Sequence, residues 1–233
     1  MTYELWYWPG FTGRGEFVRL ALEAAGIDYR DVGPEEGREH VTARLTEPCD
    51  ARPFAPPFLV AGDLVIAQTA NILLYLGEVH GLAPADMAGR LWVNQCQLTI
   101  GDMVAEAHNS HHPVGASLYY EEQAAEAQRA AQAFRTVRMP KYLGYFDALI
   151  ARRGGRLGGA AWSYADLSLL HLVDGLRHAF PRRMRALEAG LPHLAAHRDT
   201  VAALPRVAAY LVSPRCQPFG NGVFRHYPEL DAD

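Results

Sequence analysis

The stretch from residue 57 to residue 72 limits most strongly what this chain can fold into. Two short apolar runs flank the turn residues Gly62-Asp63, and the polar pair Gln68-Thr69 follows them. This pattern predicts a β-hairpin that leads into a helix. Pro57 opens the first strand, where a central strand would not accept a proline. A helix start at Thr69 offers a hydroxyl and free backbone N–H groups, which suit a carboxylate, so the stretch predicts a small-ligand site.

The first 80 residues alternate between strand and helix patterns. An aromatic run over residues 3–8 predicts a strand, and helical spacing follows the expected cap, Thr12. A second strand is expected over residues 27–32. The proline-rich stretch 33–56 is expected to be irregular, with one short helix near residues 40–45. The order βαβ and then ββα fits a thioredoxin-like plan over a single sheet.

Residues beyond 80 show helical spacing without a convincing strand. We expect an all-helical domain over residues 86–233 after a thioredoxin-like domain over residues 1–79, which makes the fold class α/β plus all-α. Ser163 and Asp166 form a capping-box pattern at one helix start, and Pro140 is expected to kink another helix. The expected helices span residues 86–112, 120–152, 164–179, 183–196 and 199–212.

Composition excludes several classes of protein. The formal net charge of -4 gives no electrostatic case for nucleic acid, and no apolar run is long enough to cross a bilayer. The first residues lack the basic and apolar regions of a signal peptide. The three cysteines, Cys49, Cys96 and Cys216, are scattered and odd in number, which favours reduced thiols over a disulfide framework. We therefore expect a cytoplasmic protein that binds neither nucleic acid nor membranes.

Tyr7 ends the first predicted strand, next to a loop, where functional side chains often lie. Because side chains alternate along a strand, Tyr7 shares a face with Leu5, and core packing alone would also explain an aromatic residue there. A phenol O–H aimed at a thiol sulfur would stabilise the thiolate, which is the nucleophilic form. Arg14, at the predicted turn into the next helix, would add a positive charge there or would be a solvated surface arginine.

Two segments, taken with the hairpin, carry a resemblance to a known family. The run Tyr3-Glu4-Leu5-Trp6-Tyr7-Trp8, followed by Gly13-Arg14-Gly15-Glu16-Phe17-Val18-Arg19, resembles the cytosolic glutathione S-transferases of the tyrosine type, of the alpha, pi and sigma kind and bacterial-looking. The resemblance implies a thioredoxin-like domain followed by a helical bundle. It implies catalytic roles for Tyr7 and Arg14. The residues that it implies for glutathione binding are Pro57, Phe58, Gln68, Thr69 and Asp102.

Each of these binding residues has an implied role under the resemblance. Pro57 matches the family's cis-proline, and Phe58 would offer its N–H and C=O to the cysteinyl part of glutathione. Gln68 and Thr69 match the pair that holds the γ-glutamyl end. Asp102 resembles the aspartate that reaches that end from the other subunit of a homodimer. One departure is that Pro56, which has no N–H, precedes Pro57, so Pro56 is the alternative cis residue.

Three histidines, His108, His111 and His112, are spaced to share one helix face. This spacing can bind a metal, but no cysteine or fourth histidine stands nearby, so we expect no metal site. The resemblance instead places this helix end at the cleft for the second substrate. The residues expected to line that cleft are Trp8, Phe11, His108, His111 and Tyr119.

The sequence therefore predicts a homodimeric glutathione transferase that uses reduced glutathione as a cosubstrate. It would activate the glutathione thiol for attack on a small hydrophobic electrophile. Two alternatives remain open at this point. One is a glutathione-dependent isomerase or peroxidase on the same fold, and the other is a non-catalytic interaction module of transferase-like structure.

Overall fold

The computed structural model describes residues 2–48 and 50–232, so Cys49 lies outside the described residues. Its four strands have the order β2-β1-β3-β4, with β1 parallel to β2 and β3 antiparallel to both β1 and β4. This arrangement is the thioredoxin-like plan that the sequence predicts. The elements of this half are β1 (Tyr3–Trp6), α1 (Gly15–Ala25), β2 (Tyr29–Asp31), α2 (Val32–Glu36), α3 (Arg38–Thr46), β3 (Phe58–Ala61), β4 (Leu64–Ala67) and α4 (Thr69–His80).

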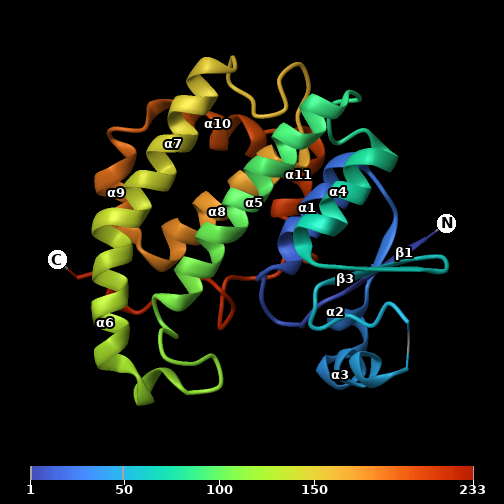
Figure 1. The fold of residues 1–233 in the computed structure, drawn as a ribbon, viewed down its shortest axis with the longest axis horizontal. Helices are drawn as coiled ribbons and strands as arrows, with labels where there is room; N and C mark the ends of the chain where they lie inside the picture. The colour runs from blue at the N-terminus through green and yellow to red at the C-terminus, as the bar shows by residue number, and fades with distance from the viewer. Residues whose placement is uncertain (1, 49, 233) are drawn as a thin grey trace.

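Helices cover both faces of the sheet: α1 and α4 lie on one side and α2 and α3 on the other (Figure 1). The two-residue period of the strands explains this. Leu5 and Leu59 point toward α1 and α4 and join the main core, whereas Trp6 and Phe58 belong to a second cluster with Val32 of α2. Both faces are therefore buried, although the central strands are only four residues long.

From α5 onward the described chain is helical apart from its connections. The α helices are α5 (Met87–Asn109), α6 (Ala124–Ala133), α7 (Met139–Arg152), α8 (Tyr164–Ala179), α9 (Pro181–Glu188), α10 (Pro192–Ala202) and α11 (Pro205–Leu211). Short turns of other helix types are η1 (Tyr120–Glu122), η2 (Phe134–Arg138) and η3 (Pro228–Leu230). The prediction of a sheet domain followed by a helical domain is confirmed as a fold class.

The long helix expected over 120–152 is helical without a break from Ala124 to Arg152, and a π-helical stretch, η2, precedes Pro140 and accommodates a residue that has no N–H to donate. Other predicted boundaries are wrong. The helices expected over 183–196 and 199–212 are three helices. Pro192 and Pro205 each occupy the first helical position of a new helix, where the lost N–H would have had no intrahelical partner.

The start of α1 also differs from the prediction. Thr12 does not cap the helix, which begins at Gly15 with Arg14 as its N-cap residue and no side-chain cap bond. Instead the Thr12 backbone N–H donates to the carbonyl of Pro218 at 3.0 Å. The C-terminal tail therefore lies against this loop. Phe224 in the tail is buried against α8, where a Cβ on Gly175 would meet its ring.

A buried carboxylate organises the start of α8. The predicted capping box is present, and the Asp166 carboxylate accepts from both the N–H and the O–H of Ser163, at 2.8 and 2.7 Å. It also accepts from the N–H groups of Leu157 and Gly158 and from Nε2 of His197. Asp166 is 0% exposed, so these hydrogen bonds replace its hydration shell.

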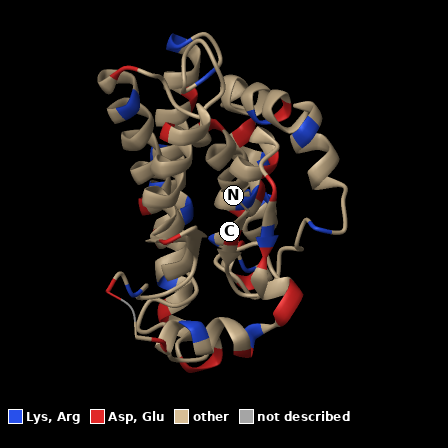
Figure 2. Ribbon diagram, turned by 90° about the vertical axis from the view of Figure 1, so that its right-hand side faces the viewer, with Lys and Arg blue, Asp and Glu red and all other residues tan. Residues whose placement is uncertain are grey.

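Acidic and basic positions alternate along the ribbon in the view of Figure 2. Among the described residues, no helix is long and apolar enough to cross a membrane. One ion-pair group is buried: Arg19 of α1 contacts both Asp31 of β2 and Glu16, and Glu16 accepts from the hydroxyl of Tyr210. This group ties α1 to the sheet and to α11.

Candidate functional site

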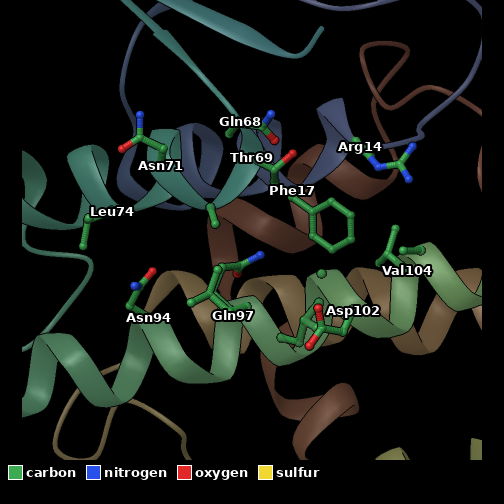
Figure 3. Close-up of a pocket in the computed structure, with 15 residues that line it drawn as sticks. Arg14, Phe17, Gln68, Thr69, Asn71, Leu74, Asn94, Gln97, Asp102 and Val104 are labelled. Carbon is green, nitrogen blue, oxygen red and sulfur yellow. The ribbon is translucent and has the colours of Figure 1, made fainter. Parts of the chain in front are cut away.

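A cavity of about 540 Å³ lies between α4 and α5, beside the start of α1 (Figure 3). It brings together four of the residues expected in the site: Arg14, Gln68, Thr69 and Asp102. The remaining lining residues are Phe17, Ala70, Asn71, Leu74, Asn94, Gln97, Leu98, Ile100, Gly101, Val104 and Ala105. Its volume is within the range of small-molecule pockets.

The first turn of α4 forms one wall of the cavity. Gln68 is the N-cap residue and has φ 70°, an uncommon backbone conformation for a residue other than glycine. Thr69, Ala70 and Asn71 follow as the first helical residues, and their N–H groups have no partners within the helix. The positive end of the helix dipole adds to these donors, so this wall suits an anionic group.

The opposite wall is one face of α5. Asn94, Gln97, Gly101 and Asp102 line it because residues three and four apart share a helix face. The other face of α5, with Val93, Cys96, Ile100 and Met103 among its members, is buried in the main core. Asp102 is exposed on the cavity side, so a carboxylate stands across the cavity from the α4 N-terminus.

Gln97 is a lining residue that the sequence analysis missed. It is 2% exposed, and its Oε1 atom is buried without a hydrogen-bond partner. It lies three residues after Asn94 and four before Gly101, but only the position of α4 shows that this helix face borders a cavity. A buried acceptor without a partner typically costs about 1–3 kcal/mol.

We therefore expect Gln97→Met to raise the free energy of unfolding by about 1 kcal/mol, because methionine fills a similar volume without an unsatisfied acceptor. Urea unfolding of the two proteins measures this difference. Gln95→Met is the matched control, since Gln95 is exposed on the same helix, and its effect should stay within about 0.5 kcal/mol. A lower free energy of unfolding in Gln97→Met would contradict the prediction, because it would show that the Gln97 carboxamide stabilises the fold.

Tyr7 lies directly after β1 and is 4% exposed. Its hydroxyl oxygen accepts from the backbone N–H of Arg14 at 2.8 Å, which leaves the phenol proton free to be donated. The ring packs on the turn into α1, where a Cβ on Gly13 or Gly15 would overlap it. Tyr7 is not itself a lining residue of the cavity, but it is hydrogen-bonded to Arg14, which is.

The environment of Tyr7 keeps its phenol protonated at neutral pH. Burial raises its pKa above the ordinary 10.0, while the Arg14 N–H and the charges of Arg14 and Arg19 act in the opposite direction. The net direction is upward, so the hydroxyl retains its proton. The hydroxyl of the neutral Tyr7 phenol can therefore donate a hydrogen bond to an acceptor in the site.

The peptide bond between Pro56 and Pro57 is cis, which makes Pro57 the cis residue and confirms the preferred alternative. Phe58 is 0% exposed and lies in β3 opposite Trp6 of β1 and Ala67 of β4, so a strand stands on both sides of its backbone. Its expected role toward glutathione stays a prediction.

The residues expected at the second-substrate cleft lie in different surroundings. Phe11 is half-buried, with its ring edge-on to Tyr7 at 6.0 Å between centroids. Trp8 packs instead against the second core cluster beneath the guanidinium of Arg38, so its packing gives no support to a cleft role. Tyr119 is 78% exposed, and it is the neighbouring Tyr120 that stacks on Tyr227 of the tail.

The three histidines do not share a helix face, because α5 ends at Asn109. They meet nevertheless: the rings of His108 and His112 are stacked, and His111 contacts both. His111 and His112 are hydrogen-bonded through their Nδ1 atoms, and Nε2 of His111 bonds the carbonyl of Val223 at 3.2 Å. Within residues 2–48 and 50–232, no group of His, Cys, Asp or Glu is placed to hold a metal ion.

Known proteins share both sequence and fold with this chain. Residues 108–214 match a family model described as "Glutathione S-transferase, C-terminal domain". A glutathione S-transferase of Plasmodium falciparum (isolate 3D7) is 22% identical over 216 residues, covering 89% of this chain and 94% of the relative. S-crystallin SL11 of Nototodarus sloanii is 27% identical over 214 residues, covering 90% and 95%.

The fold is also that of solved transferase structures. The Pi-class glutathione S-transferase of Onchocerca volvulus superimposes with a TM-score of 0.74 at 20% identity, covering 95% of this chain and 99% of that one. The model matched over residues 108–214 and the relatives along nearly the whole chain together support the resemblance to the cytosolic glutathione S-transferase family.

Proposed function

We propose that this protein is a glutathione transferase whose glutathione site is the cavity between α4 and α5. The observation that carries the proposal is the pairing of opposite walls. The N–H groups at Thr69 suit the carboxylate of an α-amino acid group, and the Asp102 carboxylate suits its ammonium. The γ-glutamyl end of glutathione carries both charges.

Tyr7 is proposed to stabilise the glutathione thiolate. An ordinary thiol has a pKa near 8.5, so most of it is protonated at neutral pH. The phenol donates a hydrogen bond to the sulfur, and the charge of Arg14 adds to it. The thiol proton passes to solvent, and the thiolate forms a bond to the electrophilic carbon, from which a leaving group departs with its electron pair.

A homodimer is part of this proposal. Leu91 and Leu98 lie on the cavity side of α5 at 63% and 52% exposure, and Leu74 of α4 is 37% exposed beside them. This apolar group is continuous with the cavity, and a second copy that covered it would close the site. Asp102 lies within this face; the resemblance assigns it to the cavity of the other subunit, whereas the pairing proposed above uses it within its own chain.

Calorimetric titration with reduced glutathione tests the proposal. It is performed near pH 7 in two buffers of different ionisation enthalpy, so that proton release appears as a difference between the two apparent enthalpies. We expect binding with net proton release, because the site stabilises the thiolate. Binding without proton release would contradict the proposed activation of the thiol. No binding at millimolar concentration would contradict the transferase proposal as a whole.

A second candidate is a non-catalytic module of the same fold. It is favoured by the match to a relative named S-crystallin rather than transferase. Failure to bind glutathione in the titration above would support it. A glutathione-dependent isomerase or peroxidase would bind glutathione equally well, and analysis of the reaction products separates these enzymes from a conjugating one.

A further inference from the structure

Three segments meet beside the loop that carries Arg14. A Cβ on Gly222 of the tail would lie 2.9 Å from the ring of Phe11 and 3.5 Å from Cα of Gly13. One residue further along, the carbonyl of Val223 bonds His111 at the end of α5. The tail therefore contacts both the Phe11–Gly13 loop and the histidine cluster, and Arg225 follows directly. We name Arg14, His108, His111, His112 and Arg225 the basic corner.

The basic corner holds two guanidinium groups without carboxylate partners in the described part of the chain. Nε of Arg225 donates to the carbonyls of Asn221 and Gly222, both at 3.1 Å, which fixes the stem of this half-buried side chain. No ion pair joins its terminal nitrogens to an acid within residues 2–48 and 50–232. Arg14 likewise has none, and its side chain extends past Phe17 on the side of Val104 (Figure 3).

The acids around the corner are engaged or turned elsewhere. Glu229, further along the tail, accepts from the hydroxyl of Tyr120 at 2.8 Å. Asp102 lies on the cavity face of α5, more than one turn before His108. Neither guanidinium group is therefore ion-paired to an acid in the described part of the chain, and a guanidinium fork without a partner suits a carboxylate.

The three histidines are neutral at pH 7, so the positive charge of the basic corner belongs to Arg14 and Arg225. Burial, followed by the charge of Arg14, lowers the pKa of His108 to about 4, and burial lowers that of His111 to about 3. The bond from the Val223 carbonyl to His111 holds this part of the tail beside the cluster, and the charge of Arg225 also lowers the pKa of all three imidazoles. Their stacked rings supply a flat surface next to the two guanidinium groups.

We propose that the basic corner binds the carboxylate of an electrophilic second substrate, so that this enzyme prefers acidic electrophiles to neutral ones of the same shape. The inference rests on the proposed transferase function and narrows its substrate class, in place of the plain hydrophobic electrophile that the sequence suggests. With an aryl chloride that bears a carboxylate, the glutathione sulfur would bond to the ring carbon. Chloride would leave with the electron pair of the C–Cl bond, and the thiol proton would pass to solvent.

The test compares two ligands that differ only in charge, 3,5-dinitrobenzoate and its methyl ester, by calorimetric titration into the full chain. We expect the carboxylate to bind at least about tenfold more tightly than the ester, as one charge-assisted pair supplies. Arg225→Gln should remove most of this preference, and Arg225→Lys should restore part of it. Arg129→Gln, which removes an exposed arginine on α6, is the matched control and should leave the preference intact.

Equal binding of the two ligands would overturn the proposal, as would a preference that survives in Arg225→Gln or disappears equally in Arg129→Gln. Because neither ligand is a glutathione substrate, this result is separate from the fate of the proposed function. A protein that binds glutathione with proton release but shows no carboxylate preference loses the inference alone. A carboxylate preference without glutathione binding removes the transferase function but retains the anion site.

Turnover gives a second readout. The reactive pair is 4-chloro-3,5-dinitrobenzoate and its methyl ester, each with glutathione at saturation. We expect the ratio of kcat/KM values to favour the carboxylate by about tenfold, mainly through KM, and to approach unity in Arg225→Gln. A change confined to kcat for both electrophiles would show that Arg225 acts on the fold or on the thiol, which contradicts a substrate-binding role.

Discussion

Asp166→Asn is expected to lower the free energy of unfolding by about 3–5 kcal/mol, because it removes a fully buried carboxylate from the groups that donate hydrogen bonds to it. Both carboxylate oxygens of Asp166 accept hydrogen bonds, from Leu157 and His197 on Oδ1 and from Gly158 and Ser163 on Oδ2. An asparagine keeps one acceptor, and its NH2 group would face donors that it cannot accept from. Urea unfolding measures the difference.

Asp174→Asn is the matched control for this prediction, because Asp174 lies on the same helix but pairs with Arg198 at the surface. That change should cost no more than about 1 kcal/mol. If the two variants lose similar amounts of unfolding free energy, the hydrogen bonds to Asp166 do not stabilise the fold to the predicted extent.

The same carboxylate predicts a pH dependence of stability. Burial alone would raise the pKa of Asp166, but its bonds to His197, Ser163 and Leu157 prevail and hold it below the ordinary 3.8. Its contribution is therefore complete above pH 3.8 and is lost as the pH falls through the lower pKa of the folded state. The stability gap between the natural protein and Asp166→Asn should narrow in acid.

Tyr7→Phe is expected to reduce kcat about 100-fold while the dissociation constant for glutathione changes by no more than a few-fold. Loss of a single hydrogen bond to a developing anion typically has an effect of this size on kcat. The phenol hydroxyl contributes to the thiolate and little to the rest of the tripeptide. Steady-state kinetics together with the glutathione titration separate the two effects.

Tyr3→Phe provides the control for the Tyr7 variant. Tyr3 begins β1, the strand that Tyr7 directly follows, and is 5% exposed; its hydroxyl bonds Nε2 of His80 at 2.8 Å, away from the cavity. Turnover should survive that change. Turnover that also survives Tyr7→Phe would remove Tyr7 from the mechanism, and thermal unfolding of both variants checks that the lost Arg14 contact has not altered the fold.

Local sequence signals predicted the elements that position the site. The hairpin around Gly62-Asp63 and the helix start at Thr69 are both present, as is the capping box at Ser163. Each depends on residues within a few positions of one another. A turn dipeptide, a helix-start hydroxyl and a reaching carboxylate act through hydrogen bonds that form locally, so a single sequence reveals them.

Signals that depend on distant partners were misread. The sequence does not reveal that β1 and β4 both pair with β3, which gives Phe58 a strand on each side. Trp8 packs beneath the guanidinium of Arg38. Arg38 belongs to α3, which lies in the stretch 33–56 that was expected to be mostly irregular. The prediction that the three histidines share one helix face was wrong because α5 ends at Asn109. The same three rings nevertheless meet through the turn that follows.

The sequence by itself determined the order of elements, the sheet and helical halves, and the donors at the start of α4, because periodicity, turns and caps are short-range properties. Tertiary structure alone decided that Gln97 borders the cavity, that Asp102 faces Thr69, and that Arg225 meets the end of α5. These contacts join residues that are far apart in the chain. They follow from how α4, α5 and the tail pack together, which depends on all the buried surfaces at once and not on any one segment.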